Sequence, residues 1–417
     1  MDGSRIVSVG RAPAGGARRD CSGCVILPGN VCGHTHLYST LARGVPYGLE
    51  APSNFVQILQ RVWWRLDRAL DEEAVRASAL VGGAAALLAG TTTVVDHHAS
   101  PSAIDGSLDV IADALETLGL RAILCYEVSD RDGPERAAAG LRENRRFLAA
   151  RRRLARGLFG AHASFTLSEE TLGACVDGAR AAGVGVHLHV AEDAADQRDA
   201  LARFGVRVTT RLARAGALGP DALLAHCIHL DAAEVETLRA SGAAVAHNPT
   251  SNMNNTVGHT PVGLLGEAVV VGTDGIGADM FVESKTAYFR ARDEDRTVGP
   301  AWPLARLAAA ARLAGRCFGE PALGTVEPGA PADLVVLAYD PPTPLVADTL
   351  AGHWTFGLGA CHVRDVMVAG ELVVADRRLT RMDAGEIAAQ ARAAAGRLWR
   401  RLEAIAPHPF EPAGGRA

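Results

Sequence analysis

Eight short apolar runs, rich in β-branched residues, recur along this chain of 417 residues, and segments with helical periodicity lie between most of them. Strands that alternate with helices in this way favour a parallel sheet joined by helical crossovers. Eight such units, followed by a closing helical region at residues 304–318, predict an α/β fold of the (β/α)8 TIM-like barrel type. The runs lie at residues 25–32, 91–95, 122–126, 157–161, 184–190, 222–225, 243–246 and 268–272.

The two ends of the chain depart from this alternation. Beyond the barrel, short apolar runs at residues 334–337, 363–368 and 371–374 have the length of strands, and the last two resemble a hairpin across Ala369-Gly370. We therefore expect a small composite β-sandwich domain built from both chain ends. The expected division is residues 1–28 and 323–383 for the sandwich, 29–322 for the barrel, and 384–417 for a closing helix and tail.

Charge and composition indicate which kinds of binding partner and which cellular location to expect. A net charge of −5 and an isoelectric point near 6.3 give no reason to expect nucleic acid or an anionic membrane as a partner. The longest apolar stretch, residues 79–95, contains several glycines and threonines and is typical of a helix followed by a strand, so no transmembrane span is expected. The cysteines are scattered, and the lone pair Cys21 and Cys24 is a weak signal for zinc or redox chemistry. We therefore expect a cytoplasmic protein.

Polar side chains close four of the apolar runs. Histidine and carboxylate are the residue types that bind divalent metals and move protons. Barrel enzymes place such groups at the carboxyl ends of their strands. Any one of these histidines alone would be interpreted as a packed core or loop residue, but four clusters in this order favour a single site. The clusters read Gly-His34-Thr-His36, His187-Leu-His189-Val-Ala-Glu192, Ala-His226-Cys and Gly-Thr-Asp274-Gly.

The spacing of the histidines in the first and fifth runs predicts metal ligands. His34 and His36 are separated by one residue, which places both side chains on the same face of a strand. His187 and His189 repeat this spacing. Of this second pair we favour His189, because it is nearer the carboxyl end of its strand and Glu192 follows three residues later.

Asp274 completes the expected metal site. It ends the eighth run, and the eighth strand lies beside the first in a closed barrel. We predict that His34, His36, His189 and Asp274 hold one divalent ion and leave a position open for water, as catalytic sites do. Three histidines and one aspartate suit Zn²⁺, Fe²⁺ or Mn²⁺, and among these we expect Zn²⁺.

Glu192, His226 and Asp274 are the predicted catalytic residues. A divalent ion lowers the pKa of its water and supplies hydroxide near neutral pH. Glu192 is placed to accept that proton and to donate it to the leaving side of a substrate. His226 can polarise or orient the attacking hydroxide, and Asp274 can accept a proton in addition to binding the metal.

These motifs resemble the amidohydrolase superfamily, on its aminohydrolase and chlorohydrolase branch, over nearly the whole chain. The resemblance implies a barrel with a composite β-sandwich, a mononuclear zinc or iron site, and hydrolytic removal of ammonia from a nitrogen heterocycle. Members usually carry a further strand or two before Ile6, so the resemblance leaves open whether the sandwich is complete. The matching stretches are PGNVCGHTHLYSTLARG, HLHVAED, LLAHCIHLDAAE, HNPTSNMNN, VGTDG and GTVEPGAPADLVVL.

The resemblance also assigns roles to residues of this chain. It implies that His162, near the end of the fourth strand, touches the substrate ring, and that the protein is a homodimer. Members with two metal ions bridge them through a carboxylated lysine on the fourth strand. Lys285, the only lysine, lies after the eighth strand, so one ion is expected. The implied ligands are His34, His36, His189 and Asp274, with Glu192 as proton shuttle and His226 as a second catalytic histidine.

Other residues near strand ends are candidates for substrate contact. Tyr38 and Arg43 follow the first strand and His247 ends the seventh, where loops carry function. His97 and His98 follow the second strand, and we expect them to pack behind the site.

Two further features receive a structural interpretation. Trp63 and Trp64 lie in a helical segment, and adjacent helical positions do not share a face. We therefore expect one of them in the core and the other over the pocket or an interface. Asn252 is expected to fix its loop through hydrogen bonds to the backbone.

The expected reaction is hydrolytic deamination of a small cyclic amidine such as a purine or pterin. Hydrolysis of a cyclic amide or ureide and hydrolytic dehalogenation of a triazine-like ring are the alternatives on the same fold. Glu192 favours deamination, because an amine leaving group needs a proton whereas chloride does not. A metal-binding scaffold without activity is disfavoured by the complete set of ligands and proton-transfer groups. The DNA-editing zinc deaminases are excluded, because the chain lacks their Pro-Cys-x-x-Cys motif.

Overall fold

The computed structural model describes residues 3–10 and 18–414, and its centre is a barrel of eight parallel strands. Two parallel sheets form the barrel, with strand orders β2-β3-β4-β5 and β6-β7-β8-β9-β10. Single bridges between Thr35 and Asp274 and between Val128 and Ala161 join the sheets at their two seams. Only Leu158 separates β5 from β6, so these two segments fill one strand position. The strands are β2 (Asn30–Thr35), β3 (Thr91–His98), β4 (Arg121–Tyr126), β5 (Ala155–Gly157), β6 (Phe159–Ala163), β7 (Val186–Val190), β8 (Leu223–His226), β9 (Ala244–His247) and β10 (Val269–Val271).

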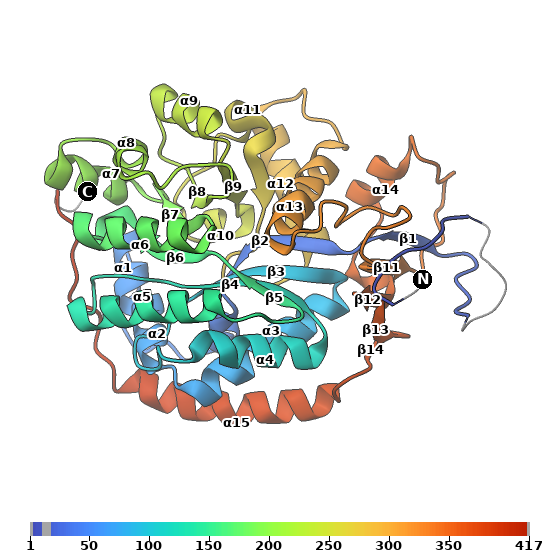
Figure 1. Cartoon of the computed structure of the whole chain (residues 1–417), viewed down its shortest axis with the longest axis horizontal. Helices are drawn as coiled ribbons and strands as arrows, with labels where there is room; N and C mark the ends of the chain where they lie inside the picture. Colours follow the sequence, from blue (N-terminus) through green and yellow to red (C-terminus); the bar gives the residue numbers. More distant parts are fainter. Residues whose placement is uncertain (1–2, 11–17, 415–417) are drawn as a thin grey trace.

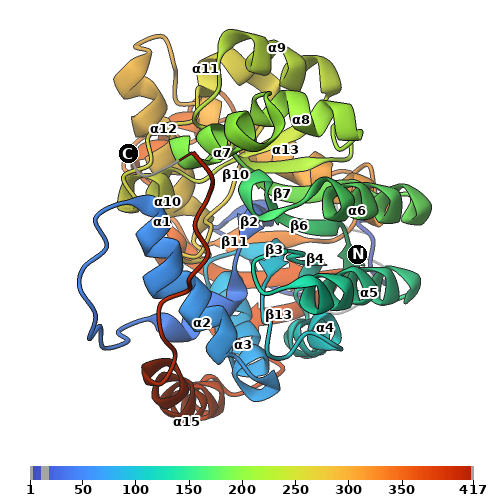
Figure 2. The same cartoon turned by 90° about the vertical axis from the view of Figure 1, so that its left-hand side faces the viewer.

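Helices cover the outside of this barrel (Figure 1, Figure 2). Asp71, Ser168, Asp193, Asp231 and Asp279 begin five of them by accepting a backbone N–H, and Asp231 is part of a capping box. The longer helices are α3 (Glu72–Leu88), α4 (Ser107–Leu118), α5 (Pro134–Ala149), α6 (Glu169–Ala182), α7 (Ala194–Phe204), α8 (Val208–Ala215), α9 (Ala232–Ser241), α12 (Met280–Glu294) and α13 (Trp302–Phe318).

Short helical segments lie in the loops that follow the strands. They surround the carboxyl ends of the barrel strands, where the polar clusters are. The segments are η1 (Leu37–Ala42), α1 (Phe55–Ile58), η2 (Leu59–Trp63), α2 (Trp64–Ala69), η3 (Ser164–Thr166) and α10 (Pro249–Asn254). Two more short segments, α11 (Val262–Leu265) and η4 (Gly266–Ala268), lead instead into the amino end of β10.

A five-stranded antiparallel sheet lies beside the barrel, at the right of Figure 1, and both chain ends contribute to it. Its strand order is β1-β11-β12-β13-β14, and the predicted hairpin across Ala369-Gly370 is confirmed. Near the N-terminus, Arg5 adds a single bridge to Pro331. The elements are β1 (Val25–Pro28), β11 (Leu334–Leu337), α14 (Leu350–Phe356), η5 (Ala360–His362), β12 (Val363–Val368), β13 (Glu371–Ala375) and β14 (Arg378–Leu379).

The first apolar run does not form one barrel strand as its pattern suggested. The chain breaks at Gly29, so that β1 pairs with β11 of the small sheet whereas β2 enters the barrel. A Cβ at Gly29 would lie 2.1 Å from a side-chain carbon of Thr92, which explains the glycine at this crossing. The Gly29 N–H donates to the carbonyl of Asp333 at 3.0 Å. A continuous apolar run can therefore cross from one sheet to another without a polar signal.

The C-terminal segment returns to the barrel. After α15 (Ala384–Glu403) the chain passes α2 and α1 and ends near α7 (Figure 2). Gln60 fixes this segment, because its carbonyl accepts from the His408 N–H at 2.9 Å and its amide donates to the Phe410 carbonyl at 2.7 Å. In the described part of the chain, no helix has both the length and the apolar character that a membrane span requires.

A buried ion pair joins the barrel to the small sheet, and its loss is expected to be costly. Arg121 Nε donates to Asp333 Oδ2 at 2.6 Å, and both side chains are at most 8% exposed. We expect Arg121→Leu to lower the free energy of unfolding by about 3–5 kcal/mol in urea denaturation, because Asp333 keeps a buried charge without its cation. Arg153→Leu is the matched control. Its pair with Glu371 is exposed, so the expected loss is below about 1 kcal/mol, and equal losses would contradict the argument.

Candidate active site

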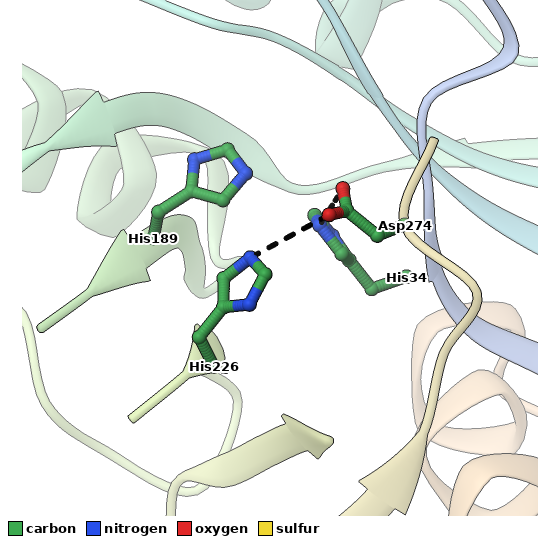
Figure 3. A group of neighbouring side chains, drawn as sticks. All are labelled: His34, His189, His226 and Asp274. Carbon is green, nitrogen blue, oxygen red and sulfur yellow. Dashed lines mark ion pairs between the residues drawn. The ribbon is translucent and has the colours of Figure 1, made fainter. Parts of the chain in front are cut away.

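Four side chains from separate strand ends converge at the mouth of the barrel (Figure 3). His34 comes from β2, His189 from β7, His226 ends β8, and Asp274 follows β10. Their potential ligand atoms all lie within 4.8 Å of one another. Asp274 is central, since its Oδ1 lies 3.5 Å from His34 Nε2 and its Oδ2 lies 3.9 Å from His226 Nε2. The structure therefore brings together residues that are up to 240 positions apart in the chain.

His36 belongs to the same cluster. Its Nε2 lies 3.0 Å from Asp274 Oδ1 and 3.1 Å from His189 Nε2. The predicted set of His34, His36, His189 and Asp274 is thus assembled in space, with His226 beside it.

Hydrogen bonds on the far side of each ring fix how the histidines face the cluster. In three of them Nδ1 lies against an oxygen that can only accept, so Nδ1 carries the hydrogen and the lone pair of Nε2 points inward. This is the tautomer that a metal ligand requires. The bonds run from His36 to the His97 carbonyl at 2.6 Å, from His189 to the His162 carbonyl at 2.9 Å, and from His226 to Asn252 Oδ1 at 2.8 Å.

The donor set fits a divalent cation. Within the described residues, His34 Nε2 and His226 Nε2 are buried and make no hydrogen bond, although both face the Asp274 carboxylate. Buried polar atoms normally have partners, so inward lone pairs without one indicate a group that binds between them. His187 lies behind the cluster, with its Nε2 2.9 Å from His34 Nδ1.

Backbone strain marks the strand ends that carry these groups. Ala191, His226, Cys227 and Asp274 have φ values of 46°, 72°, 51° and 52°, in the left-handed region that residues other than glycine rarely adopt. Such strain persists only where the surroundings impose it, and it gathers at functional sites. Here the strained residues lie where β7, β8 and β10 end, and the chain turns sharply at these points. Each of them is Glu192, His226 or Asp274 or a direct neighbour of one of these residues.

Glu192 borders the cluster on one side. Its Oε2 lies 3.5 Å from His226 Nε2, and its carboxyl group is hydrogen-bonded to Asn255. Burial, reinforced by the charge of Asp274, raises the pKa of Glu192 well above its ordinary value. For Asp274 burial acts in the same direction, but the close contacts of its carboxylate with His34 and His36 outweigh burial and hold its pKa well below the ordinary value. The two acids thus favour opposite protonation states, the arrangement that proton transfer needs.

A cavity that opens to solvent lies over the cluster. One wall is apolar and aromatic, and the other carries the polar groups of the cluster. The apolar wall consists of Phe55, Leu59, Trp63, Trp64, Phe165 and Ile276.

Both tryptophans border this cavity, and the expected difference between them is present: Trp64 is 2% exposed and packs in the core, whereas Trp63 is only partly buried. Leu59–Trp63 is a π-helical turn, in which the Trp64 N–H donates to the Leu59 carbonyl. A π turn adds a residue to the helical repeat and is frequent at functional sites. It lets Trp63 and Trp64 share the cavity wall.

Comparison with known proteins identifies the family. Residues 25–373 match the model of the amidohydrolase family. The chain belongs to this family. A 5′-deoxyadenosine deaminase of Methanosarcina mazei is 30% identical over 400 residues, which cover 92% of this chain and 88% of that protein. A 5-methylthioadenosine/S-adenosylhomocysteine deaminase of Nitratidesulfovibrio vulgaris is 32% identical, with 93% and 87% covered.

A solved structure agrees with this assignment. The crystal structure of an adenosine deaminase from Xanthomonas campestris with bound zinc has a TM-score of 0.78 to this amidohydrolase at 27% identity, covering 92% of this chain and 87% of that one. The predicted fold class is confirmed, and so is the predicted enzyme class, a hydrolase of carbon–nitrogen bonds of the deaminase type.

The candidate substrate residues of this amidohydrolase divide into three groups. Tyr38 and His162 border the cavity. Arg43 is exposed and lines an adjoining pocket, which shares Trp63 with the cavity. His247 is fully buried outside the cavity lining, with its ring 5.4 Å from that of His259.

His97 and His98 lie behind the site, as expected. His97 Nδ1 is 3.2 Å from Glu127 Oε2, and His98 Nε2 is 2.8 Å from Ser100 Oγ. Neither borders the cavity of this amidohydrolase.

Four residues of the site were missed or misjudged from the sequence. Asn252 makes backbone hydrogen bonds within its loop, to Asn248 and from Val257, but its side chain also orients His226, which was not expected. Ser251 donates to Asp274 Oδ2, and Asn255 borders the cavity beside Glu192. All three belong to the polar run that follows the seventh strand, which was the available signal. Glu127 also borders the cavity, and its place directly after β4 is the same strand-end position as the other clusters.

Proposed function

We propose that this amidohydrolase is a metal-dependent deaminase, which releases ammonia from a small nitrogen heterocycle such as a purine, a pterin or a similar cyclic amidine. The observation that carries the proposal is the position of Glu192. Its carboxyl group borders the cavity and lies 3.5 Å from His226 Nε2, beside the Asp274 cluster. An amine is a poor leaving group until it is protonated, so an acid at this point suits ammonia release.

The residues that hold the metal are His34, His36, His189 and Asp274, and the expected ion is Zn²⁺. His36 is preferred over His226 as a ligand because its Nε2 lies closer to Asp274 and to His189, whereas His226 Nε2 faces Glu192. When bound, a divalent cation activates water at neutral pH and polarises the atom under attack.

Glu192 moves the proton in this mechanism. Over one turnover it gives its proton to the amino group that leaves and regains a proton from the attacking water. His226 donates Nδ1–H to Asn252, so its Nε2 is free to orient the incoming water by hydrogen bonding. Asp274, whose carboxylate stays ionised beside His34 and His36, can take the remaining proton as the ring carbon returns to planarity.

Tyr38 and His162 are proposed to contact the substrate ring from the cavity wall. Arg43 reaches only a substituent that extends into the adjoining pocket. His247 does not line the cavity in this structure. Its predicted role in substrate binding would therefore have to be indirect, through a residue such as His226 or Asp274. The homodimer and the cytoplasmic location remain predictions.

The names of the relatives suggest an adenine nucleoside as the first substrate to test. We expect the zinc-loaded protein to release ammonia from at least one class in a panel of amino-substituted purines and their nucleosides, pterins, pyrimidines and triazines. The panel also contains cyclic ureides and chlorinated triazines. A ring-opened acid from the former or chloride from the latter, without ammonia from any amine, would replace the deaminase proposal by the corresponding alternative.

A further inference from the structure

Glu127 borders the cavity but has no part in the chemistry described above. It follows β4 directly, and its backbone N–H donates to the His98 carbonyl at 2.7 Å, which holds it against the end of β3. Its side chain is only 3% exposed. A carboxylate this deeply buried needs partners, either within the protein or from a molecule that enters the cavity.

Arg131 keeps Glu127 charged. Its Nη1 donates to Glu127 Oε1 at 2.8 Å, and the same guanidinium pairs with Asp67 and, at 3.2 Å, with Asp132. One buried guanidinium therefore serves three acidic side chains, and burial raises the pKa of one of them, Asp67, to about 7. Although burial opposes ionisation, the charge of Arg131 and the contact with His97 hold the pKa of Glu127 well below its ordinary value.

The partners within the protein do not use all the hydrogen-bond acceptor sites of the Glu127 carboxylate. Each carboxylate oxygen can accept two hydrogen bonds. Arg131 supplies one to Oε1, and His97 Nδ1 lies 3.2 Å from Oε2. Acceptor sites therefore remain on an ionised group that borders the cavity.

His162 adds a second acceptor next to the first. Its Nδ1 lies 2.6 Å from Thr166 Oγ1, and that hydroxyl donates to the Ala163 carbonyl, so Nδ1 is the donor of the pair. In the neutral ring Nε2 then carries a lone pair, and it lies 3.8 Å from Glu127 Oε1. Two acceptors side by side on a cavity wall require a hydrogen-bond donor from the cavity.

The rest of the cavity lining carries acidic side chains and, among the described residues, lacks basic ones of the arginine and lysine type. It includes four carboxylates. Arg43 lies in the adjoining pocket and is exposed. An anionic group inside the cavity would find no cation of the protein, whereas donors and cations would find several acceptors. The carboxylates are Glu127, Glu192, Asp196 and Asp274.

We propose that Glu127 is a specificity-determining residue, which accepts a hydrogen bond from a second donor group of the substrate. This donor is an amino, ring N–H or hydroxyl group other than the amino group that leaves. The substrate class is accordingly a donor-rich, uncharged or cationic amino-heterocycle, and analogues that carry a carboxylate are rejected. The inference rests on the proposed deaminase function and deepens it.

The test compares paired compounds that differ by one or two donor groups. The pairs are 2,6-diaminopurine with adenine, 2,4-diaminopteridine with 4-aminopteridine, and 5′-deoxyadenosine with its analogue that lacks the 2′ and 3′ hydroxyls. We expect the zinc-loaded wild type to prefer the donor-bearing member by about 10- to 100-fold in kcat/KM, the range for a hydrogen bond to a charged group. Glu127→Gln should reduce this preference at least about tenfold, mainly through KM. S-adenosylhomocysteine should be a far poorer substrate than 5′-deoxyadenosine.

Glu143→Gln is the matched control. Glu143 is also a buried glutamate paired with an arginine, but it serves the backbone of α4 and lies outside the cavity lining. It should lower stability without changing the preference. The wild-type comparison needs no variant, so it decides the proposal even if Glu127→Gln does not fold.

Three results would overturn the proposal. One is equal kcat/KM within every hydrolysed pair, and another is a preference that Glu127→Gln retains. The third is a second zinc ion per chain that Glu127→Gln loses, because Glu127, His162 and His189 also lie close enough to share an ion. If no compound is hydrolysed, the deaminase function fails instead. Calorimetric affinities for the same pairs then decide the role of Glu127, and equal affinities would refute it.

Discussion

Glu192→Gln is expected to slow ammonia release by roughly 10³-fold, with zinc content unchanged. A positioned acid–base group contributes about 10²–10⁴ in rate, and here Glu192 serves both the attacking water and the leaving amine. Glutamine keeps the shape and the hydrogen bond to Asn255 but neither accepts nor releases a proton at neutral pH. The loss should fall on kcat, since the change removes an interaction made in the transition state. Steady-state ammonia release and zinc per chain are the measurements.

Glu143→Gln serves again as the control, because it makes the same chemical change at a buried glutamate outside the cavity. Its kcat should stay within about twofold of wild type, the range of a substitution that touches no reacting group. Near-wild-type ammonia release by Glu192→Gln would assign the proton transfer to another group, of which His226 at 3.5 Å is the nearest. A parallel loss of zinc in Glu192→Gln would instead show that the residue supports the metal site.

The metal cluster could be predicted from the sequence because it depends on a short-range rule. Alternation along a strand places His34 and His36 on one face, and the end of a strand places Asp274 at the barrel mouth. The choice of His189 over His187 followed from the same rule, and in the structure His187 lies behind the cluster. Barrel topology alone then brings these strand ends together.

The cavity walls could not be predicted in the same way. The shared placement of Trp63 and Trp64 depends on one π-helical turn, which a 3.6-residue period does not represent. The role of Glu127 depends on Arg131, which pairs with it from a turn and also reaches Asp67 on α2. The break at Gly29 depends on the approach of Thr92. Each of these features arises from contacts between segments. Such contacts produce no regular spacing of residues from which they could be predicted.

His189→Ala is expected to lower bound zinc from about one ion per chain to below about one tenth, and to abolish ammonia release. His189 Nε2 lies 3.1 Å from His36 Nε2, and the protein has already oriented the ring through the His162 carbonyl. Removing it leaves three ligands and a gap in the cluster. Zinc per chain after dialysis and kcat are the primary measurements.

Thermal unfolding with and without a chelator separates loss of metal from loss of fold. At a free zinc concentration 100 times the Kd, binding stabilises the folded wild type by about 2.7 kcal/mol, so chelation should lower its Tm. The Tm of His189→Ala should be the same with and without chelator, and should approach that of the metal-free wild type. His353→Gln is the control, because His353 pairs with Tyr339 outside the cluster and should leave zinc content unchanged. Full zinc binding by His189→Ala would show that His226, within 4.8 Å of the same cluster, replaces His189 as a ligand.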